Sequence, residues 1–178
     1  MQRITPLTTD HQLILECLEV LRLIVERMQS EETVDPADIA TVIAFMRDVA
    51  CECLDHTQEM LLRPALLRAT NKNHVQHLKA AVARHHTVRP ALEDTAAVTT
   101  SRKHFVLHAH LLTKVVSDLI IEEDESLLDQ AVDLLCDAEG QRSVASFIEK
   151  EREISALAIE RGRLLHRLEA KYAYPQCI

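Results

Sequence analysis

Apolar residues recur at helical spacing along nearly the whole chain. In the first predicted helix, residues 10–29, they lie three or four positions apart, which is the spacing of side chains on one helix face. The same period continues in five further segments, which are 36–68, 73–94, 104–128, 128–138 and 146–172. The pattern therefore predicts four long amphipathic helices followed by C-terminal helices.

The connections between these helices are short and carry helix-start chemistry. Asp35 followed by Pro36 fits an N-cap and the first helical position, and Gly140 is expected to end the short helix over 128–138. Long helices with modest connections favour an all-α, up-down-up-down four-helix bundle with additional C-terminal helices. We expect a single domain over residues 1–178, with the bundle at about 8–128 and a helical extension at about 129–174.

The amino-acid composition supports helices and argues against nucleic acids and membranes as partners. The chain is 47% hydrophobic with only 3% aromatic residues and 2 glycines, whereas sheets usually bring more aromatics and turns. The net charge of −8 and the lack of a basic stripe argue against nucleic-acid binding. We expect no membrane association, because the N-terminus lacks a signal-peptide core and no apolar run approaches the roughly 18 residues of a span.

These features predict a cytoplasmic protein. The five cysteines, an odd number without an export signal, are therefore expected to be free thiols: Cys17, Cys51, Cys53, Cys136 and Cys177. The long charged helix at the C-terminus is expected to pack outside the bundle, or to form a homodimer or bind a protein partner.

Three polar residues interrupt the apolar stripes, each on a different predicted helix: His11, His85 and Glu123. A buried carboxylate without a partner costs several kcal/mol, so Glu123 should meet either a histidine or a metal. The three residues fit hydrogen-bonded core positions. They also fit a set of two imidazoles and one carboxylate offered to a single iron. Without a metal, Glu123 would be protonated or paired with a histidinium.

The stretch CLDHTQEMLLRPAL, residues 53–66, offers a second histidine and glutamate. The helical period places Glu59 on the solvent side, where Arg63 four residues on can pair with it. His56 falls at the edge of the buried face, and its role stays open, as does that of His108. The inward positions of this stretch belong to Leu54 and Gln58.

Four segments of the chain resemble the hemerythrin-like (HHE cation-binding) family, and together they cover nearly its whole length. TTDHQLILECLEVL is similar to the family's first helix, with His11 at its histidine. VIAFMRDVACECLDHTQEMLLRPAL is similar to the second helix, and VARHHTVRPAL to the third, with His85 at the ligand position. FVLHAHLLTKVVSDLIIEEDESLL is similar to the fourth helix, where Glu123 and Asp124 match the Glu-Asp pair.

The resemblance implies a two-iron centre with about four histidines and two bridging carboxylates, used with dioxygen, nitric oxide or peroxide. The chain departs from that ligand set at three positions. Leu54 and Leu119 stand at ligand histidines, and Gln58 stands at a bridging glutamate. Two adjacent cations need bridging negative charge, so the losses argue against di-iron chemistry.

Two functions remain open from the sequence. The first is a non-enzymatic binding or regulatory protein that has lost its metals, with no cofactor. The second is a metalloprotein with a reduced site at His11, His85 and Glu123, holding one iron or zinc. No phosphate loop, nucleophile elbow or paired catalytic carboxylates support a hydrolase or a transferase.

Overall fold

A computed structural model describes residues 7–173, which are almost entirely helical and contain no strand. The first long segment is α1 (Leu7–Gln29), and the third is α5 (Lys72–Ala97). The second segment is a continuous run of α2 (Pro36–Phe45), η1 (Met46–Ala50), α3 (Cys51–Thr57), η2 (Gln58–Leu62) and α4 (Arg63–Arg68). The fourth comprises α6 (Arg102–Glu122), η3 (Glu123–Leu127) and α7 (Leu128–Leu134), and the fifth is α8 (Ala138–Ala173).

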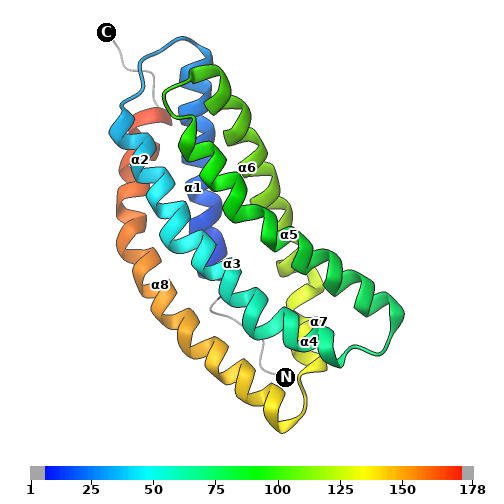
Figure 1. The fold of residues 1–178 in the computed structure, drawn as a ribbon. Coiled ribbons are helices and arrows are strands. Elements are labelled where there is room, and N and C mark those ends of the chain that lie inside the picture. The colour runs from blue at the N-terminus through cyan, green and yellow to red at the C-terminus, as the bar shows by residue number, and fades with distance from the viewer. Residues whose placement is uncertain (1–6, 174–178) are drawn as a thin grey trace.

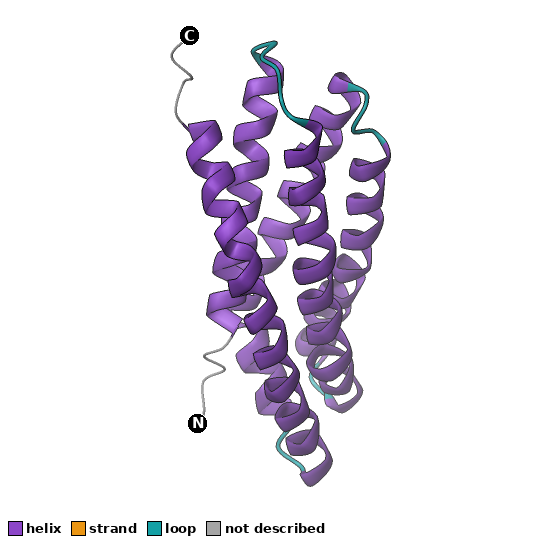
Figure 2. Cartoon of the chain, turned by 90° about the vertical axis from the view of Figure 1, so that its left-hand side faces the viewer, coloured by secondary structure: helices purple, strands orange, loops and turns teal. Residues whose placement is uncertain are grey.

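Successive long segments reverse direction and lie side by side along one axis (Figures 1 and 2). Helix α1 packs against both α6 and α8, and α5 packs against α6. Their apolar faces meet in one continuous core, in which residues such as Leu21, Leu61 and Phe105 are fully buried. The all-helical class expected from the sequence is thus present, and the helices bury the faces that the apolar period marked.

Side-chain caps fix the starts of two helices. Asp35 accepts a hydrogen bond from the backbone N–H of Ala37 at 2.9 Å, and Pro36 occupies the first turn of α2. Asn71 does the same for α5 through the N–H of Asn73, also at 2.9 Å. A side-chain oxygen at this position satisfies one of the unpaired donors of the first turn. The predicted start at Asp35–Pro36 is confirmed.

Three π-helical turns interrupt the second and fourth segments. Each π turn widens the helix by about one residue, which rotates all later side chains relative to a regular α-helix. The turn η2 begins at Gln58, and η3 begins at Glu123, so two of the three start at inward-facing polar residues that the apolar period marked. Pro64 lies directly after η2 in the first turn of α4, and the helical run continues past it to Arg68.

The glycine prediction for the C-terminal region was wrong. Helix α7 ends at Leu134, and α8 already begins at Ala138, so Gly140 lies in the first turn of α8 rather than after a helix end. Neither described glycine adopts a positive φ angle. Gly140 is needed for another reason, because a Cβ there would lie 2.7 Å from the carbonyl oxygen of Leu135.

The long helix α8 packs along α1 and along the second segment (Figure 1). Its apolar stripe is buried within the chain: Phe147, Ile154, Ala158, Leu165, Leu168 and Tyr172. Gly162 brings the two helices close, since an added Cβ would lie 3.0 Å from Leu13 Cδ2. Helix α8 therefore belongs to the same hydrophobic core as α1.

Helix α6 is long and apolar enough to cross a membrane by length and composition. Lys114 and Asp118 interrupt the apolar residues of α6, so this finding does not test the expectation about an uninterrupted apolar run. About a third of its most apolar window is buried inside the chain. A core helix of a soluble protein meets the same criterion, so the finding indicates only how apolar α6 is.

Candidate buried polar site

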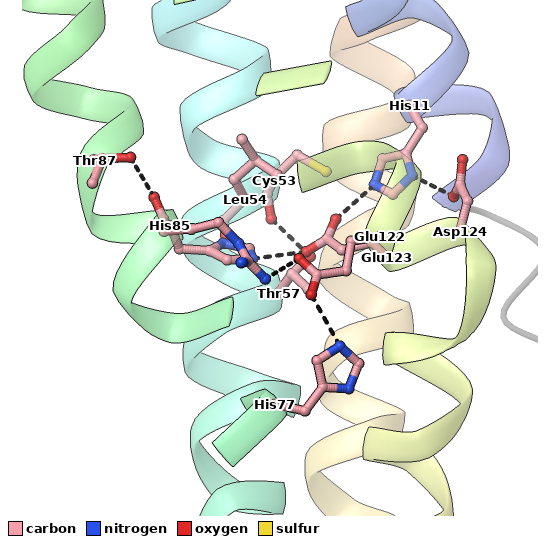
Figure 3. A network of polar contacts seen from close by, with 11 residues as sticks. His11, Cys53, Leu54, Thr57, His77, His85, Thr87, Glu122, Glu123 and Asp124 are labelled. Atoms are coloured by element: carbon pink, nitrogen blue, oxygen red, sulfur yellow. Dashed lines mark hydrogen bonds and ion pairs between the residues drawn. The ribbon is translucent and has the colours of Figure 1, made fainter. Parts of the chain in front are cut away.

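His11, His85 and Glu123 come together in the interior, as the sequence predicted (Figure 3). His11 Nε2 lies 3.2 Å from Glu123 Oε2, and His85 Nε2 lies 2.9 Å from Glu123 Oε1. The three residues are at most 2% exposed. Glu123 therefore bridges two histidines, one on each of its carboxylate oxygens.

The other ring nitrogen of each histidine is held as well. His11 Nδ1 lies 2.7 Å from Asp124 Oδ1, and His85 Nδ1 lies 3.0 Å from the carbonyl oxygen of Leu54. Because a carbonyl oxygen only accepts, His85 Nδ1 carries a proton and donates it. The rings are thus fixed in orientation, with both Nε2 atoms pointing at Glu123 (Figure 3).

The charges of this network reinforce one another. Burial lowers the pKa of His11, but its contacts with Asp124, Cys53 and Glu123 outweigh burial and raise that pKa to about 12. Burial raises the pKa of Glu123, and here the contacts with His11 and His85 prevail and hold the pKa below its usual value. Near neutral pH, His11 is therefore an imidazolium and Glu123 is a carboxylate.

The inward-facing residues Leu54, Gln58 and Leu119 are also buried. Leu54 and Leu119 are at most 1% exposed, and their side chains offer no ligand atom. Gln58 is 4% exposed, and its Nε2 donates to Glu59 Oε1 at 3.3 Å, while its own Oε1 has no partner. Two adjacent irons would need the bridging charge that a neutral amide lacks, so a two-iron centre does not fit these residues.

The remaining candidates of the second segment lie away from the network. Glu59 pairs with Arg63 at 3.0 Å on the surface, as expected. His56 is partly buried and stacks on Phe147 of α8, with ring centroids 5.2 Å apart. Burial lowers the pKa of His56, so the neutral ring serves as a packing surface for α8. His108 is partly buried on α6.

The cysteines within residues 7–173 are all free thiols, which confirms that part of the prediction; Cys177 lies outside the described residues. Cys17, Cys51 and Cys53 are buried, and Cys136 is exposed. Burial raises the pKa of Cys51 to about 11 and that of Cys53 to about 12. These thiols are thus protonated near neutral pH.

A second polar cluster, which the sequence reasoning missed, lies beside the first. It consists of Asp10 on α1, Cys53 on α3 and Glu151 on α8, and we call it the thiol–carboxylate cluster. Each of the three residues is 0% exposed. Burial raises the pKa of Asp10, and burial together with Asp10 raises that of Glu151 to about 8. The two carboxyl groups therefore share a proton at neutral pH.

The helical period contained the signal for this cluster. Glu151 stands four residues after Phe147 and three before Ile154, inside the apolar stripe of α8. Asp10 stands four residues before the buried Ile14 in the same way. The reasoning that singled out Glu123 would have found both residues.

Scans against protein-family models, the curated proteins and the solved structures found no match to this chain. The fold defines the chain as an all-helical protein. Within residues 7–173, its polar interior combines a His–Glu–His bridge with the adjacent thiol–carboxylate cluster.

Proposed function

We propose that this chain is a hemerythrin-like four-helix bundle, extended by α8, that has lost di-iron chemistry and acts as a non-enzymatic, cytoplasmic binding or regulatory protein. The bridge formed by Glu123 carries the proposal, because both of its oxygens are matched by histidines. Residues that would bind iron in the hemerythrin-like family therefore bind one another in this chain.

The ion-pair network is electrically complete without a cation. The histidinium of His11 neutralises Glu123 on one side and contacts Asp124 on the other. Leu54 and Leu119 stand where the family resemblance implies ligand histidines, and their apolar side chains fill the interior. Burial to at most 2% exposure also keeps a substrate of ordinary size from His11, His85 and Glu123.

Binding would then take place on the outer faces of the helices. The inner stripe of α8 is used within the chain, so a partner at this helix would meet its outer face, where Ile159 and Leu164 are exposed. A homodimer through that face would be one way of covering them. The acidic balance of the chain favours neither nucleic acid nor an anionic surface as the partner.

Metal analysis tests the loss of di-iron chemistry. Protein produced with ample iron and purified under reducing conditions should contain little iron and show no iron absorption bands. It should also consume peroxide no faster than the His85→Ala variant. His86→Ala is the matched control, because His86 is the exposed neighbour of His85. Two irons per chain, lost in His85→Ala and kept in His86→Ala, would overturn the proposal.

A second function is favoured by the way the histidines are held. Metal-binding histidines commonly donate their other ring N–H to a carboxylate or a backbone carbonyl, and His11 and His85 are held in this manner by Asp124 and Leu54. A single iron or zinc ion could bind between the two Nε2 atoms and Glu123 in place of a proton. Such a site, with one metal and fewer ligands than a two-iron centre, could act on oxygen, nitric oxide or peroxide.

The same purification distinguishes the two functions. One metal ion per chain, lost in both His85→Ala and Glu123→Gln, would favour the reduced metal site over the metal-free network. Retention of metal in both variants would place any ion elsewhere and leave the ion-pair network intact as proposed.

A further inference from the structure

The thiol–carboxylate cluster joins three helices that are distant in sequence. Among the side chains that the structure describes, Asp10, Cys53 and Glu151 are the only group of three or more His, Cys, Asp or Glu residues whose ligand atoms all lie within 4.8 Å of one another. They come from α1, α3 and α8, and each is fully buried. Metal sites built between helices have this layout, with facing side chains converging from different segments.

Several polar atoms in this cluster have no hydrogen-bond partner. Both carboxylate oxygens of Glu151 and Asp10 Oδ1 are buried, and apart from the proton that the two carboxyl groups share they have no hydrogen-bond partner. The other oxygen of Asp10 accepts a hydrogen bond from Ser155 Oγ at 2.7 Å, which orients the carboxylate. A buried polar atom without a partner is costly, so such atoms indicate a missing ligand. The outer hydrogen bond from Ser155 is the kind of support that ligating carboxylates receive.

The donor types select the ion. A thiolate with two carboxylates suits Zn²⁺, which accepts sulfur and oxygen together, whereas Mg²⁺ and Ca²⁺ prefer oxygen alone. In a tetrahedral zinc site with bonds of about 2.0–2.3 Å, ligand atoms lie roughly 3.3–3.8 Å apart. The ligand atoms lie within 4.8 Å of one another, so an ion would draw them closer together. Three protein ligands leave the fourth position to a water molecule.

A divalent cation also lowers the net charge that the deprotonated cluster would bury. A thiolate and two carboxylates together carry three negative charges, and Zn²⁺ offsets two of them. Zn²⁺ thereby leaves the cluster with one net negative charge instead of three, which lowers the cost of burying its deprotonated ligands.

We propose that Asp10, Cys53 and Glu151 form a binding site for one Zn²⁺ ion that links α8 to α1 and α3. This site is separate from the bridge of His85 and Glu123, so it goes beyond the proposed function and does not depend on it. In the metal-bound chain, zinc replaces the thiol proton of Cys53 and the proton shared by the two carboxyl groups. Zinc occupancy thereby stabilises the docking of α8.

Zinc titration of the metal-free, reduced protein tests the site. We expect one Zn²⁺ per chain, a higher melting temperature with zinc, and a thiolate charge-transfer band when Co²⁺ is used instead. Cys53→Ser and Glu151→Gln should weaken zinc binding by more than about 100-fold, beyond the loss from outer-shell changes. Both should abolish the thermal shift, and Cys53→Ser should abolish the Co²⁺ band.

Two control variants keep the result specific. Cys136→Ser removes an exposed thiol, and His86→Ala removes an exposed histidine; both should bind zinc as the wild type does. Glu151→Gln is the variant expected to keep its fold, because the amide replaces a carboxyl group that holds a proton. Circular dichroism of the metal-free variants checks this.

The proposal is overturned if the wild-type chain takes up no zinc, or if Cys53→Ser and Glu151→Gln bind zinc with wild-type affinity. Zinc binding that is lost in His85→Ala but kept in Cys53→Ser would also overturn it, and would assign the ion to His11, His85 and Glu123. The metal-free proposal for that network would then fail as well, whereas a wild-type chain that takes up no zinc would overturn the zinc site alone.

Discussion

At the scale of single residues, Glu123 links the polar groups of the interior. Its carboxylate contacts His11 on one oxygen and His85 on the other, and all three side chains are nearly inaccessible to water. Burying an ion pair is costly in itself, but removing one partner is worse, because an uncompensated charge stays behind. A neutral glutamine at position 123 would therefore reveal the contribution of Glu123 to stability, because it leaves the charge on His11 unpaired.

We predict that Glu123→Gln destabilises the metal-free protein by about 3–5 kcal/mol near neutral pH. The glutamine would leave the His11 imidazolium without its buried counter-charge, and His11 would have to lose its proton. Urea unfolding of both proteins, followed by circular dichroism, measures the difference. Because the folded-state pKa of Glu123 is lowered, the contribution should be present above about pH 4.5 and decline as the pH falls further.

Glu59→Gln serves as the control for this prediction, since Glu59 forms an exposed pair with Arg63. Loss of such a surface pair costs about 0–1 kcal/mol. Equal stabilities of Glu123→Gln and the wild type would mean that Glu123 carries a proton and no charge.

At the scale of helices, the polar contacts at one end of α8 complement its apolar stripe. Asp38 on α2 accepts hydrogen bonds from Lys171 Nζ at 2.6 Å and from Tyr172 Oη at 2.5 Å. Burial raises the pKa of Asp38, but these two contacts prevail, so its pKa lies below the usual value. The far end of α8 is thus tied to the start of the second segment by charge-assisted hydrogen bonds.

We predict that Asp38→Asn lowers the free energy of unfolding by about 1.5–3 kcal/mol at pH 7, because two hydrogen bonds to a charged acceptor are weakened. The folded-state pKa of Asp38 is depressed, so the stabilisation is present above the unfolded value of 3.8 and is lost as the pH falls below it. Urea unfolding at neutral pH and near pH 3 checks both parts.

The variant Asp118→Asn is a suitable comparison, because Asp118 pairs with Lys114 on the exposed face of α6. It should change stability little at either pH. A difference between Asp38→Asn and the wild type that persists unchanged in acid would contradict the role given to the Asp38 carboxylate.

At the scale of the whole molecule, α8 completes the interior that the other helices begin. It places Phe147 against His56 and contributes Glu151 to the buried cluster. Its position beside α1 brings groups from opposite ends of the chain together, such as Asp10 and Ser155. The first four segments alone would expose this part of the core to water.

We predict that a chain ending at residue 137 does not fold to a stable monomer. Each large apolar side chain of α8 that is buried on folding contributes about 1.5–3 kcal/mol, and the five such residues together rival the 5–15 kcal/mol of a typical domain: Phe147, Ile154, Leu165, Leu168 and Tyr172. Amide dispersion in NMR spectra and size-exclusion chromatography would show the loss. Cooperative unfolding of the shortened chain would instead make residues 8–128 an independent bundle.

The sequence was sufficient to identify the helices and their buried faces, because a period of three to four residues follows from helix geometry alone. It also singled out His11, His85 and Glu123, since each breaks an apolar stripe. The start at Asp35–Pro36 was equally local, because a cap depends on neighbouring residues. What the sequence could not show was which oxygen of Glu123 meets which histidine.

Tertiary packing decided the rest. The π turns that begin at Gln58 and Glu123 rotate the following side chains relative to a regular α-helix, and the local sequence does not predict these turns. Gly140 reads locally as a helix end, yet the approach of the Leu135 backbone explains it. Asp10, Cys53 and Glu151 form a cluster only because α8 returns along α1 and α3, and a contact between such distant residues depends on how whole helices pack.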